Sequence, residues 1–410
     1  MKVYLVGGAV RDGFLGKYAK DKDWVVVGAT PADMIANGFK QVGKDFPVFL
    51  HPETKEEYAL ARTERKSGKG YTGFVTAFSP DVTLEEDLAR RDLTINAIAR
   101  DEAGNIIDPY NGLADIENKV LRHVTPAFVE DPLRILRVAR FKSRFHKLGF
   151  EVAEDTNLLM KNIVARGELQ HLTAERVWAE TQSALLEPSP EQYFFALLDC
   201  NALEWVFPEV FRLFGVPQRK IYHPEIDTGL HTMMALSYAA KKNFCAEIRF
   251  AVLVHDLGKA DTDPGLLPRH IGHEIRSLKR VKEMCARLKI PKSYEQLAMI
   301  VAEFHTLCHQ ALSLKPATVL KLLEKVDAFR RPERFDLFVQ ACEADARGRK
   351  GFENVEYPQS NYLLEAYRIS SALGVEKIIA EGYKGVEIGN QLKQQRLRAI
   401  KELKQSYERL

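Results

Sequence analysis

Two aspartates separated by one residue, Asp21 and Asp23, precede a short apolar run at residues 24–27. Side chains alternate along a β-strand, so residues two apart share a face and these two carboxylates are expected to lie side by side. Mg²⁺ is a hard cation that proteins hold with one or two carboxylates together with substrate phosphates. The spacing therefore predicts a magnesium site in which Asp21 and Asp23 are the catalytic ligands.

A glycine pair and an arginine come just before these aspartates. Gly7 and Gly8 follow an apolar, strand-like run at residues 3–6, and Arg11 stands three residues later. Without a Cβ, glycines let backbone N–H groups approach a triphosphate, and a guanidinium matches phosphate oxygens. Taken singly, the glycines are often only a turn and Asp-x-Asp only solvated surface. Their order in one strand–turn–helix–strand unit favours nucleotidyl transfer.

An arginine-rich helix is expected from Asp131, since aspartate suits the N-cap and Pro132 suits the first turn. Four arginines then fall on one face and an apolar set on the opposite face. No acidic residue four positions on pairs with them, so the row favours binding of nucleotide and RNA phosphates. Simple capping and a solvated face are the alternatives. The row is Arg134, Arg137, Arg140 and Arg144, and the apolar set is Ile135, Leu136, Val138 and Ala139.

Three motifs resemble those of one family: residues 7–12 (Gly-Gly-Ala-Val-Arg-Asp) with 21–23 (Asp-Lys-Asp), residues 90–97 (Arg-Arg-Asp-Leu-Thr-Ile-Asn-Ala), and residues 130–134 (Glu-Asp-Pro-Leu-Arg). They are similar to motifs of the class II tRNA nucleotidyltransferases, or CCA-adding enzymes, and of bacterial poly(A) polymerases. The resemblance implies a DNA polymerase β-like head with a nucleotide site. The residues it assigns to ATP and CTP are Gly8, Arg11, Arg91, Asp131, Arg134, Arg137 and Arg140.

The same resemblance implies that Asp131 and Arg134 read the incoming base, first of CTP and then of ATP. A carboxylate accepts hydrogen bonds from the exocyclic amines of cytosine and adenine, whereas uracil and guanine present a carbonyl there. A third catalytic carboxylate is expected on a neighbouring strand. Glu57 is the candidate, with Glu56 and Glu64 left open.

The second half contains dispersed histidines and a His-Asp doublet, His255-Asp256, after an apolar run. With His231 before the doublet and Asp345 far after it, these residues resemble the ligand set of the HD phosphohydrolase superfamily. Imidazole and carboxylate ligands suit divalent transition metals such as Ni²⁺, Co²⁺ or Mn²⁺ and leave positions for water. The resemblance makes His255 and Asp256 catalytic and His231, His255, Asp256 and Asp345 metal ligands. Two further histidines resemble the extra ligands of some members, namely His273 and His305.

The other histidines receive no such role. His270 competes with His273 for one position, and His273 is preferred because it follows a turn more closely. His223 precedes a proline and is expected in a loop. The histidines expected to be ordinary are His51, His123, His146 and His171.

Composition is that of an ordinary globular protein. The chain has 410 residues and 46% hydrophobic residues, which fits two to four domains. Its net charge of +3 is too small to indicate a nucleic-acid partner by itself. Its five cysteines form no Cys-x-x-Cys pair, which is typical of reduced, cytoplasmic thiols. Neither a signal peptide nor a membrane-spanning run is expected.

The chain is expected to be an α+β protein. A nucleotidyltransferase head with a mixed sheet is predicted at residues 1–129, and a helical neck that binds nucleotide and tRNA at 130–225. An all-α HD phosphohydrolase domain is predicted at 226–346 and a helical tail at 347–410. A Gly- and Lys-rich segment at 62–73 is expected to form a mobile loop over the substrate.

The expected activity is addition and repair of the CCA end of tRNA without a nucleic-acid template, with CTP, ATP and Mg²⁺. The HD module is expected to hydrolyse phosphoesters such as 2′,3′-cyclic or 2′-phosphates with a transition metal. The protein is expected to be a monomer or a homodimer without a membrane partner. Two alternatives remain, a poly(A) polymerase and an HD phosphohydrolase whose head is a nucleotide-binding regulatory module.

Overall fold

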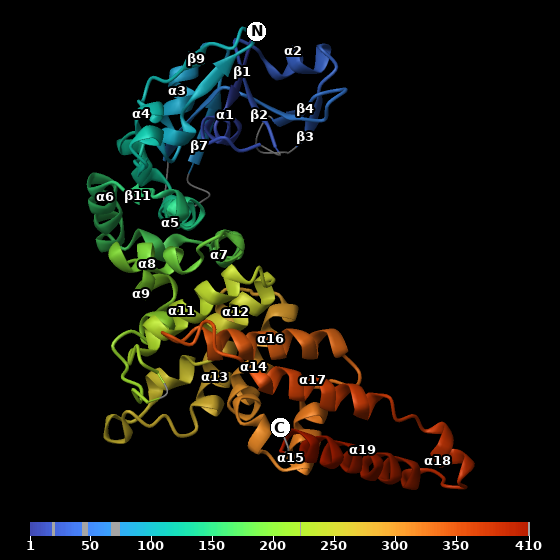
Figure 1. The fold of residues 1–410 in the computed structure, drawn as a ribbon. Helices are drawn as coiled ribbons and strands as arrows, with labels where there is room; N and C mark the ends of the chain where they lie inside the picture. The colour runs from blue at the N-terminus through green and yellow to red at the C-terminus, as the bar shows by residue number, and fades with distance from the viewer. Residues whose placement is uncertain (19–20, 43–47, 67–73, 222, 409–410) are drawn as a thin grey trace. The chain divides into compact units, whose positions relative to one another are not determined.

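The computed structural model describes residues 1–410 except 19–20, 43–47, 67–73, 222 and 409–410, and only the backbone at 64–66 and 74–78. Residue contacts divide the chain into two compact units, Met1–Val206 and Phe207–Leu410. Unit 1 contains the strands of the described residues, and unit 2 is helical (Figure 1).

A seven-stranded mixed sheet forms the head of unit 1, in the order β3-β4-β5-β2-β1-β8-β9. Strand β2 runs parallel to β5, and the other neighbouring strands are antiparallel. Pairing of β1 with β2 sets Val6 opposite Asp23, so the glycine turn and the acidic start of β2 lie at one end of the sheet. The strands are β1 Lys2–Val6, β2 Asp23–Val27, β3 Lys40–Val42, β4 Val48–Leu50, β5 Glu57–Leu60, β8 Ala99–Asp101 and β9 Ile106–Ile107.

Helices cover both faces of the sheet, because successive side chains along a strand point to opposite faces and pack against different helices. Val25 packs in a cluster with Leu88 of helix α3, whereas Val26 packs in a second cluster with Met34 of α2. Leu5 joins Val10 of α1 in a third cluster. The helices of the head are α1 Gly8–Phe14, α2 Pro31–Ala36, α3 Leu84–Ala89 and α4 Gly112–Glu117, with the 3₁₀ turns η2 Thr94–Asn96 and η3 Pro126–Glu130.

The segment 62–73, expected to be a loop, begins as a strand. Strand β6 (Arg62–Lys66) pairs antiparallel with β7 (Phe74–Phe78), which sets Arg62 opposite Phe78. Aromatic and β-branched residues in β7 favour such a hairpin, and pairing satisfies its backbone groups. The loop expectation is therefore wrong for 62–66, and its remainder lies outside the described residues.

Helices follow the sheet in unit 1, with one exception. Strand β11 (Glu151–Val152) pairs in parallel with β10 (Val120–Leu121) and so ties the helical segment back to the head. The helices of this segment are α5 Leu133–Phe145, α6 Glu154–Ala165, α7 Ala174–Leu186, α8 Glu191–Asp199 and α9 Leu203–Val206, with the turns η4 His146–Leu148 and η5 Glu168–His171.

Unit 2 is built around helix α12, whose residues are all buried except Glu247. α12 packs against α11, α14 and α16 (Figure 1). Its C-terminal end leads directly into His255 and Asp256. The α-helices are α10 Pro208–Phe211, α11 Thr228–Lys241, α12 Ala246–Val254, α13 His273–Arg287, α14 Lys292–His309, α15 Pro316–Lys325, α16 Pro332–Arg347, α17 Pro358–Ser371, α18 Glu376–Ala380 and α19 Val386–Tyr407. The 3₁₀ turns are η6 Leu257–Asp261, η7 Pro264–Leu266 and η8 Ala311–Ser313.

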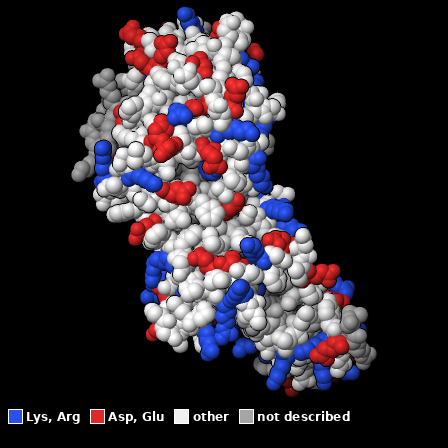
Figure 2. All heavy atoms as spheres, turned by 60° about the vertical axis from the view of Figure 1, so that its left-hand side comes forward, with Lys and Arg blue, Asp and Glu red and all other residues white. Residues whose placement is uncertain are grey.

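Surface charge is mixed in sign. On the face seen in Figure 2, basic and acidic side chains are interspersed, in keeping with a net charge of only +3. All five cysteines are free. Within the part of the chain that the structure describes, no helix has both the length and the apolar character needed to cross a bilayer.

Candidate functional site

Helix α5 carries the arginine row predicted from the sequence, but it begins one residue later than expected. Leu133 is its first residue and Pro132 its N-cap. Asp131 has an extended backbone, and its Oδ1 accepts a hydrogen bond from the Leu133 N–H at 3.1 Å. Asp131 therefore satisfies a free N–H at the helix start from outside the helix.

The row does have carboxylate partners, which the sequence analysis did not foresee. Arg137 Nη2 lies 2.8 Å from Asp92 Oδ2, and Arg140 Nε lies 2.6 Å from Glu180 Oε2. Arg144 pairs with Glu187 at 3.0 Å. The partners come from the head and from α7 and its C-cap, far away in sequence. The protein itself thus supplies part of the negative charge that was predicted to come from bound phosphates.

The two residues expected to read the base, Asp131 and Arg134, both form hydrogen bonds within the protein. Arg134 is only 6% exposed and donates to the carbonyls of Ala127 and Arg90 at 2.8 and 2.6 Å. Asp131 accepts two hydrogen bonds from Arg176 of α7, at 2.7 and 3.3 Å. The sequence analysis missed Arg176 because it stands outside every recognised motif.

The motif at residues 90–97 forms one connected network. Arg91 contacts Asp87 of α3 and the carbonyl of Asn96, while the Asn96 amide donates to Asp92 at 2.9 Å. Burial by itself raises the pKa of Asp92. Arg137 and Asn96 outweigh this effect, so that the pKa of Asp92 lies far below its usual value. Attraction to Asp92 in turn raises the pKa of Arg137. Asp92 therefore stays charged and anchors the middle of the arginine row.

The glycine turn lies against this network. Gly7 has a φ of 68° and begins α1 as its N-cap. A Cβ at Gly7 would lie 2.9 Å from Nη1 of Arg91, so only glycine fits without displacing that arginine. Arg11 is 3% exposed, pairs with Asp12, donates to Asn96 and stacks over Phe145 at 5.0 Å. Burial lowers its pKa.

The predicted magnesium ligands lie at the end of the sheet that carries the glycine turn. Asp23 is the first residue of β2 and Asp21 lies just before the strand, so strand alternation does not govern Asp21; both residues are exposed. Glu57 stands directly beside Asp23 in the parallel pairing of β2 with β5. Glu56 instead binds Lys22 and the indole N–H of Trp24, at 3.1 and 2.8 Å. The side chain of Glu64 is outside the described part.

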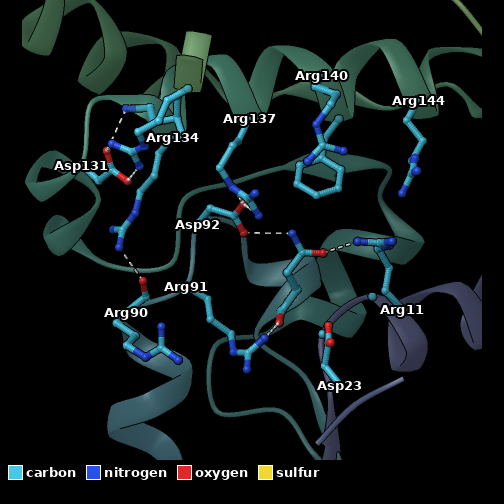
Figure 3. A pocket seen from close by; sticks show the side chains of 16 residues that line it. Arg11, Asp23, Arg90, Arg91, Asp92, Asp131, Arg134, Arg137, Arg140 and Arg144 are labelled. Carbon is cyan, nitrogen blue, oxygen red and sulfur yellow. Dashed lines mark hydrogen bonds and ion pairs between the residues drawn. The ribbon is translucent and has the colours of Figure 1, made fainter. Parts of the chain in front are cut away.

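These elements enclose a cavity of about 480 Å³. In Figure 3 the arginines of α5 line one side, with Arg11, Arg91 and Asp23 across from them. Eight arginines and three aspartates line it, so the cavity suits a polyanion such as a nucleoside triphosphate. The residues are Gly7, Gly8, Arg11, Asp23, Arg90, Arg91, Asp92, Asn96, Asp131, Leu133, Arg134, Arg137, Arg140, Phe141, Arg144 and Arg176. Asp21 is not among them.

A second cluster lies inside unit 2, where four buried residues predicted as metal ligands converge. His231 Nε2 lies 2.9 Å from Asp345 Oδ1. His255 Nε2 lies 3.1 Å from Asp256 Oδ2 and 3.5 Å from Asp345 Oδ2. The residues come from α11, the end of α12 and α16, which pack together.

The extra histidines belong to the same cluster. Nε2 of His273 and of His305 lie 3.2 and 3.6 Å from Asp256 Oδ1. His270 lies outside and contacts Thr262 and the carbonyl of Pro217. His223 is in a loop, as expected, yet its ring lies 4.6 Å from that of His231.

The donor set fits a divalent transition metal. Among the described residues, His255 Nε2 and Asp256 Oδ1 are buried and make no hydrogen bond of good geometry, although each has an ion-pair partner, at 3.1 and 3.2 Å. Buried polar atoms left in this state are costly unless something binds them. Burial lowers the pKa of His255, but Asp256 and Asp345 raise it to about 9. Burial, helped by His255 and His273, lowers the pKa of His305 far below its usual value in spite of the nearby carboxylates, which keeps it neutral and able to ligate.

Sequence reasoning missed three members of this cluster. His309 Nε2 lies 2.6 Å from Asp345 Oδ2, and Lys259 Nζ lies 2.6 Å from Asp256 Oδ2. Glu225 lies 2.9 Å from His231 Nδ1. One signal was available, because His309 follows His305 by four residues and therefore shares its helix face.

Comparison with known proteins finds two matching family models and several solved structures of the same fold. The family model "Poly A polymerase head domain" matches residues 3–122, and the model "Probable RNA and SrmB- binding site of polymerase A" matches residues 149–213. Among solved structures, a CCA-adding enzyme in apo form II superposes with a TM-score of 0.65 at 22% identity, covering 98% of this chain and 88% of that one. The Thermotoga maritima CCA-adding enzyme complexed with tRNA gives a TM-score of 0.63 at 20% identity, covering 99% of this chain and 91% of that one.

The sequence similarity extends over the whole chain. A "Multifunctional CCA protein" of Thioalkalivibrio sulfidiphilus (strain HL-EbGR7) is 59% identical over 404 residues, which cover 98% of this chain and 99% of the relative. From this identity, the matching head domain and the shared fold, it follows that the chain belongs to the family of the multifunctional CCA proteins, among the class II tRNA nucleotidyltransferases.

Proposed function

We propose that unit 1 adds C, C and A to the 3′ end of tRNA, with CTP and ATP as substrates and without a nucleic-acid template. The observation that supports this most directly is the arginine-lined cavity that meets Asp23 at the end of the sheet. The relatives support the choice of substrates, since solved CCA-adding enzymes of this fold include complexes with tRNA, ATP and CTP.

In this reaction the 3′-hydroxyl oxygen of the RNA attacks the α-phosphorus of the nucleotide, and pyrophosphate leaves. Asp21 and Asp23 would hold Mg²⁺, with Glu57 beside them as a third carboxylate. When bound, Mg²⁺ lowers the pKa of the attacking hydroxyl and neutralises the triphosphate. The backbone at Gly8 and the guanidinium groups of the cavity would orient the phosphates, and Asp131 and Arg134 would select the base. The guanidinium groups proposed for this task belong to Arg11, Arg91, Arg137 and Arg140.

We further propose that tRNA lies along the helical segment at residues 130–225, next to a head at 1–129. The match of residues 149–213 to a probable RNA-binding region supports this assignment. Phosphate and shape contacts are expected to dominate there, as is usual for double-helical RNA.

We propose a second activity for residues 226–346, hydrolysis of phosphoesters by an HD-type metal site, with residues 347–410 as a helical tail. The buried His–Asp cluster supports it. His231, His255, Asp256 and Asp345 would hold a divalent transition metal such as Ni²⁺, Co²⁺ or Mn²⁺, with His273 and His305 as further ligands. Such a metal, when bound, supplies a water of low pKa and polarises a phosphoryl oxygen. Expected substrates are 2′,3′-cyclic and 2′-phosphates on RNA ends or nucleotides.

The first activity is tested with tRNA lacking its CCA end and labelled CTP, ATP or both. Ordered addition that stops after three nucleotides supports the proposal. A long A tail would identify a poly(A) polymerase instead, and no incorporation would leave the head a regulatory module.

The second activity is tested on the metal-depleted full chain. Hydrolysis of a 2′,3′-cyclic phosphate that returns with Ni²⁺, Co²⁺ or Mn²⁺ but not with Mg²⁺ supports the metal site. Failure of every metal to restore hydrolysis would refute it.

A further inference from the structure

A cavity of about 530 Å³ opens beside the His–Asp cluster of unit 2. Three contacts join the two. Lys259 lies in the wall of the cavity and contacts Asp256, and Thr306 lies in the wall next to His305. The carbonyl of His270 lies 2.8 Å from Nδ1 of His273. The lining residues are Gln218, Arg219, His223, Lys259, Pro268, Arg269, His270, Ile271, Thr306 and Gln310.

The lining of this cavity contains two arginines and a lysine and no carboxylate among the described residues. Lys259 is not available to a ligand, because its Nζ already contacts Asp256 and Gln218, both at 2.6 Å. Arg219 and Arg269 are exposed, and in the described part of the chain neither forms an ion pair. The cavity therefore keeps two guanidinium groups available for an anion.

Other arginines near this cavity form ion pairs with carboxylates or donate hydrogen bonds to backbone carbonyls. Arg212 and Arg280 share Asp261, at 2.8 and 2.7 Å. Arg276 donates to the carbonyls of Gly258 and Ile271. Arg219 and Arg269 therefore differ from these three arginines, because their guanidinium groups remain available to bind an anion.

We propose that Arg219 and Arg269 bind the phosphodiester group next to the phosphate that is hydrolysed. The inference rests on the proposed HD activity and names its substrate class, an RNA 3′ end of at least two nucleotides rather than a mononucleotide. The terminal phosphate occupies the His–Asp cluster, and the adjoining nucleotide occupies the cavity, whose volume is in the range of small-ligand sites. A guanidinium fork suits a phosphodiester because it donates two parallel hydrogen bonds.

The kinetic test compares a 2′,3′-cyclic mononucleotide with a dinucleotide that ends in a 2′,3′-cyclic phosphate, on the metal-loaded full chain. The wild type is expected to favour the dinucleotide in kcat/KM by about tenfold, the value of one charge-assisted hydrogen bond. In R219A/R269A the ratio is expected to fall to about one, mainly through KM. The matched control is Arg398→Ala, a surface arginine of α19 paired with Glu402, which should keep the wild-type ratio.

A binding test without metal gives an independent measurement. A dinucleotide carrying 4-thiouracil and a 3′-phosphate is crosslinked by light to metal-free protein, and the labelled peptides are identified by mass spectrometry. Labelling is expected next to the cavity, in peptides that contain residues 218–223 or 268–271, and is expected to be lost in R219A/R269A. Labelling confined to unit 1 would overturn the inference.

The outcomes separate the two proposals. If the wild type hydrolyses neither substrate with any of the metals, the HD activity itself is refuted. If it hydrolyses both equally well and the double variant keeps that ratio, only the dinucleotide inference is refuted. Thermal melting of each variant serves as the check that unit 2 is folded, and addition of CCA as the check on unit 1.

Discussion

Asp131 and Arg176 form a two-armed ion pair, with Arg176 Nη2 2.7 Å from Oδ2 and Nη1 3.3 Å from Oδ1 of Asp131. Asp131 lies just before α5 and Arg176 in α7, and their side chains are 21% and 24% exposed. Arg176 therefore holds the carboxylate that is proposed to read the base. Base selection is expected to depend on this arginine as well as on Asp131.

We expect Arg176→Ala to weaken the choice of CTP and ATP over UTP and GTP, since the carboxylate of Asp131 loses the partner that orients it. The loss should be about 1–3 kcal/mol of discrimination. Single-turnover incorporation of each nucleotide measures it. In a double-mutant cycle with Asp131→Ala, the two changes should be non-additive. Arg166→Ala, an exposed arginine at the C-cap of α6, is the matched control, and equal selectivity in Arg176→Ala and this control would contradict the prediction.

Asp131→Ala and Arg134→Ala should both relax base selection but differ in stability. Arg134 is buried and donates to two carbonyls, so its loss leaves those acceptors without a donor. Such a loss should lower the free energy of unfolding by about 1–3 kcal/mol, whereas Asp131→Ala should cost less because Asp131 is partly exposed. Thermal melting of the two variants checks the order. Unchanged selectivity in both would reduce Asp131 to a helix-capping residue.

The pKa of Asp92 predicts a particular dependence of stability on pH. Its folded pKa is depressed, so its contribution is present above the unfolded pKa of about 3.9 and declines as pH falls below it. Asp92→Asn removes this contribution. Calorimetric melting of the wild type and the variant should therefore differ most near pH 7 and progressively less from pH 5 down to pH 3. A constant difference across this range would show that Asp92 is not charged in the folded protein.

The two proposed sites are expected to fail independently, since they share no residue. Asp23→Ala should abolish nucleotide addition and spare hydrolysis of a 2′,3′-cyclic phosphate. His255→Ala or Asp256→Ala should do the reverse, because loss of a ligand from a small donor set weakens metal binding. Both activities are measured on each purified variant. Normal hydrolysis by Asp256→Ala would refute the proposed HD activity.

His309 is expected to be a positioning residue for Asp345. Its Nε2 lies 2.6 Å from Asp345 and its Nδ1 lies 2.8 Å from the hydroxyl of Tyr357. His309→Ala should lower metal affinity by about 10- to 100-fold, as loss of a supporting hydrogen bond typically does. Metal titration of the purified protein measures this, and CCA addition should not change. His171→Ala, at the end of η5 in unit 1, is the control, and equal metal affinity in both variants would contradict the role.

The sequence by itself determined the features that depend on neighbouring residues. The turn at Gly7, the acidic start of β2 and the single face of the α5 arginines follow from backbone preference and from strand and helix periodicity. The His255-Asp256 doublet was also visible, because it ends an apolar run long enough for a buried helix. Together with the resemblance of these motifs to known families, the local patterns indicated a nucleotidyltransferase head and a separate His–Asp cluster.

Only the tertiary structure decided the partners of these residues. Glu180 for Arg140, Arg176 for Asp131 and His309 for Asp345 lie between 36 and 45 positions away along the chain. No periodicity relates such pairs, because their distance is set by how helices pack and not by spacing within a helix. For the same reason the sequence indicated an arginine row that needs anions, while folding decided how much of that charge the protein itself neutralises.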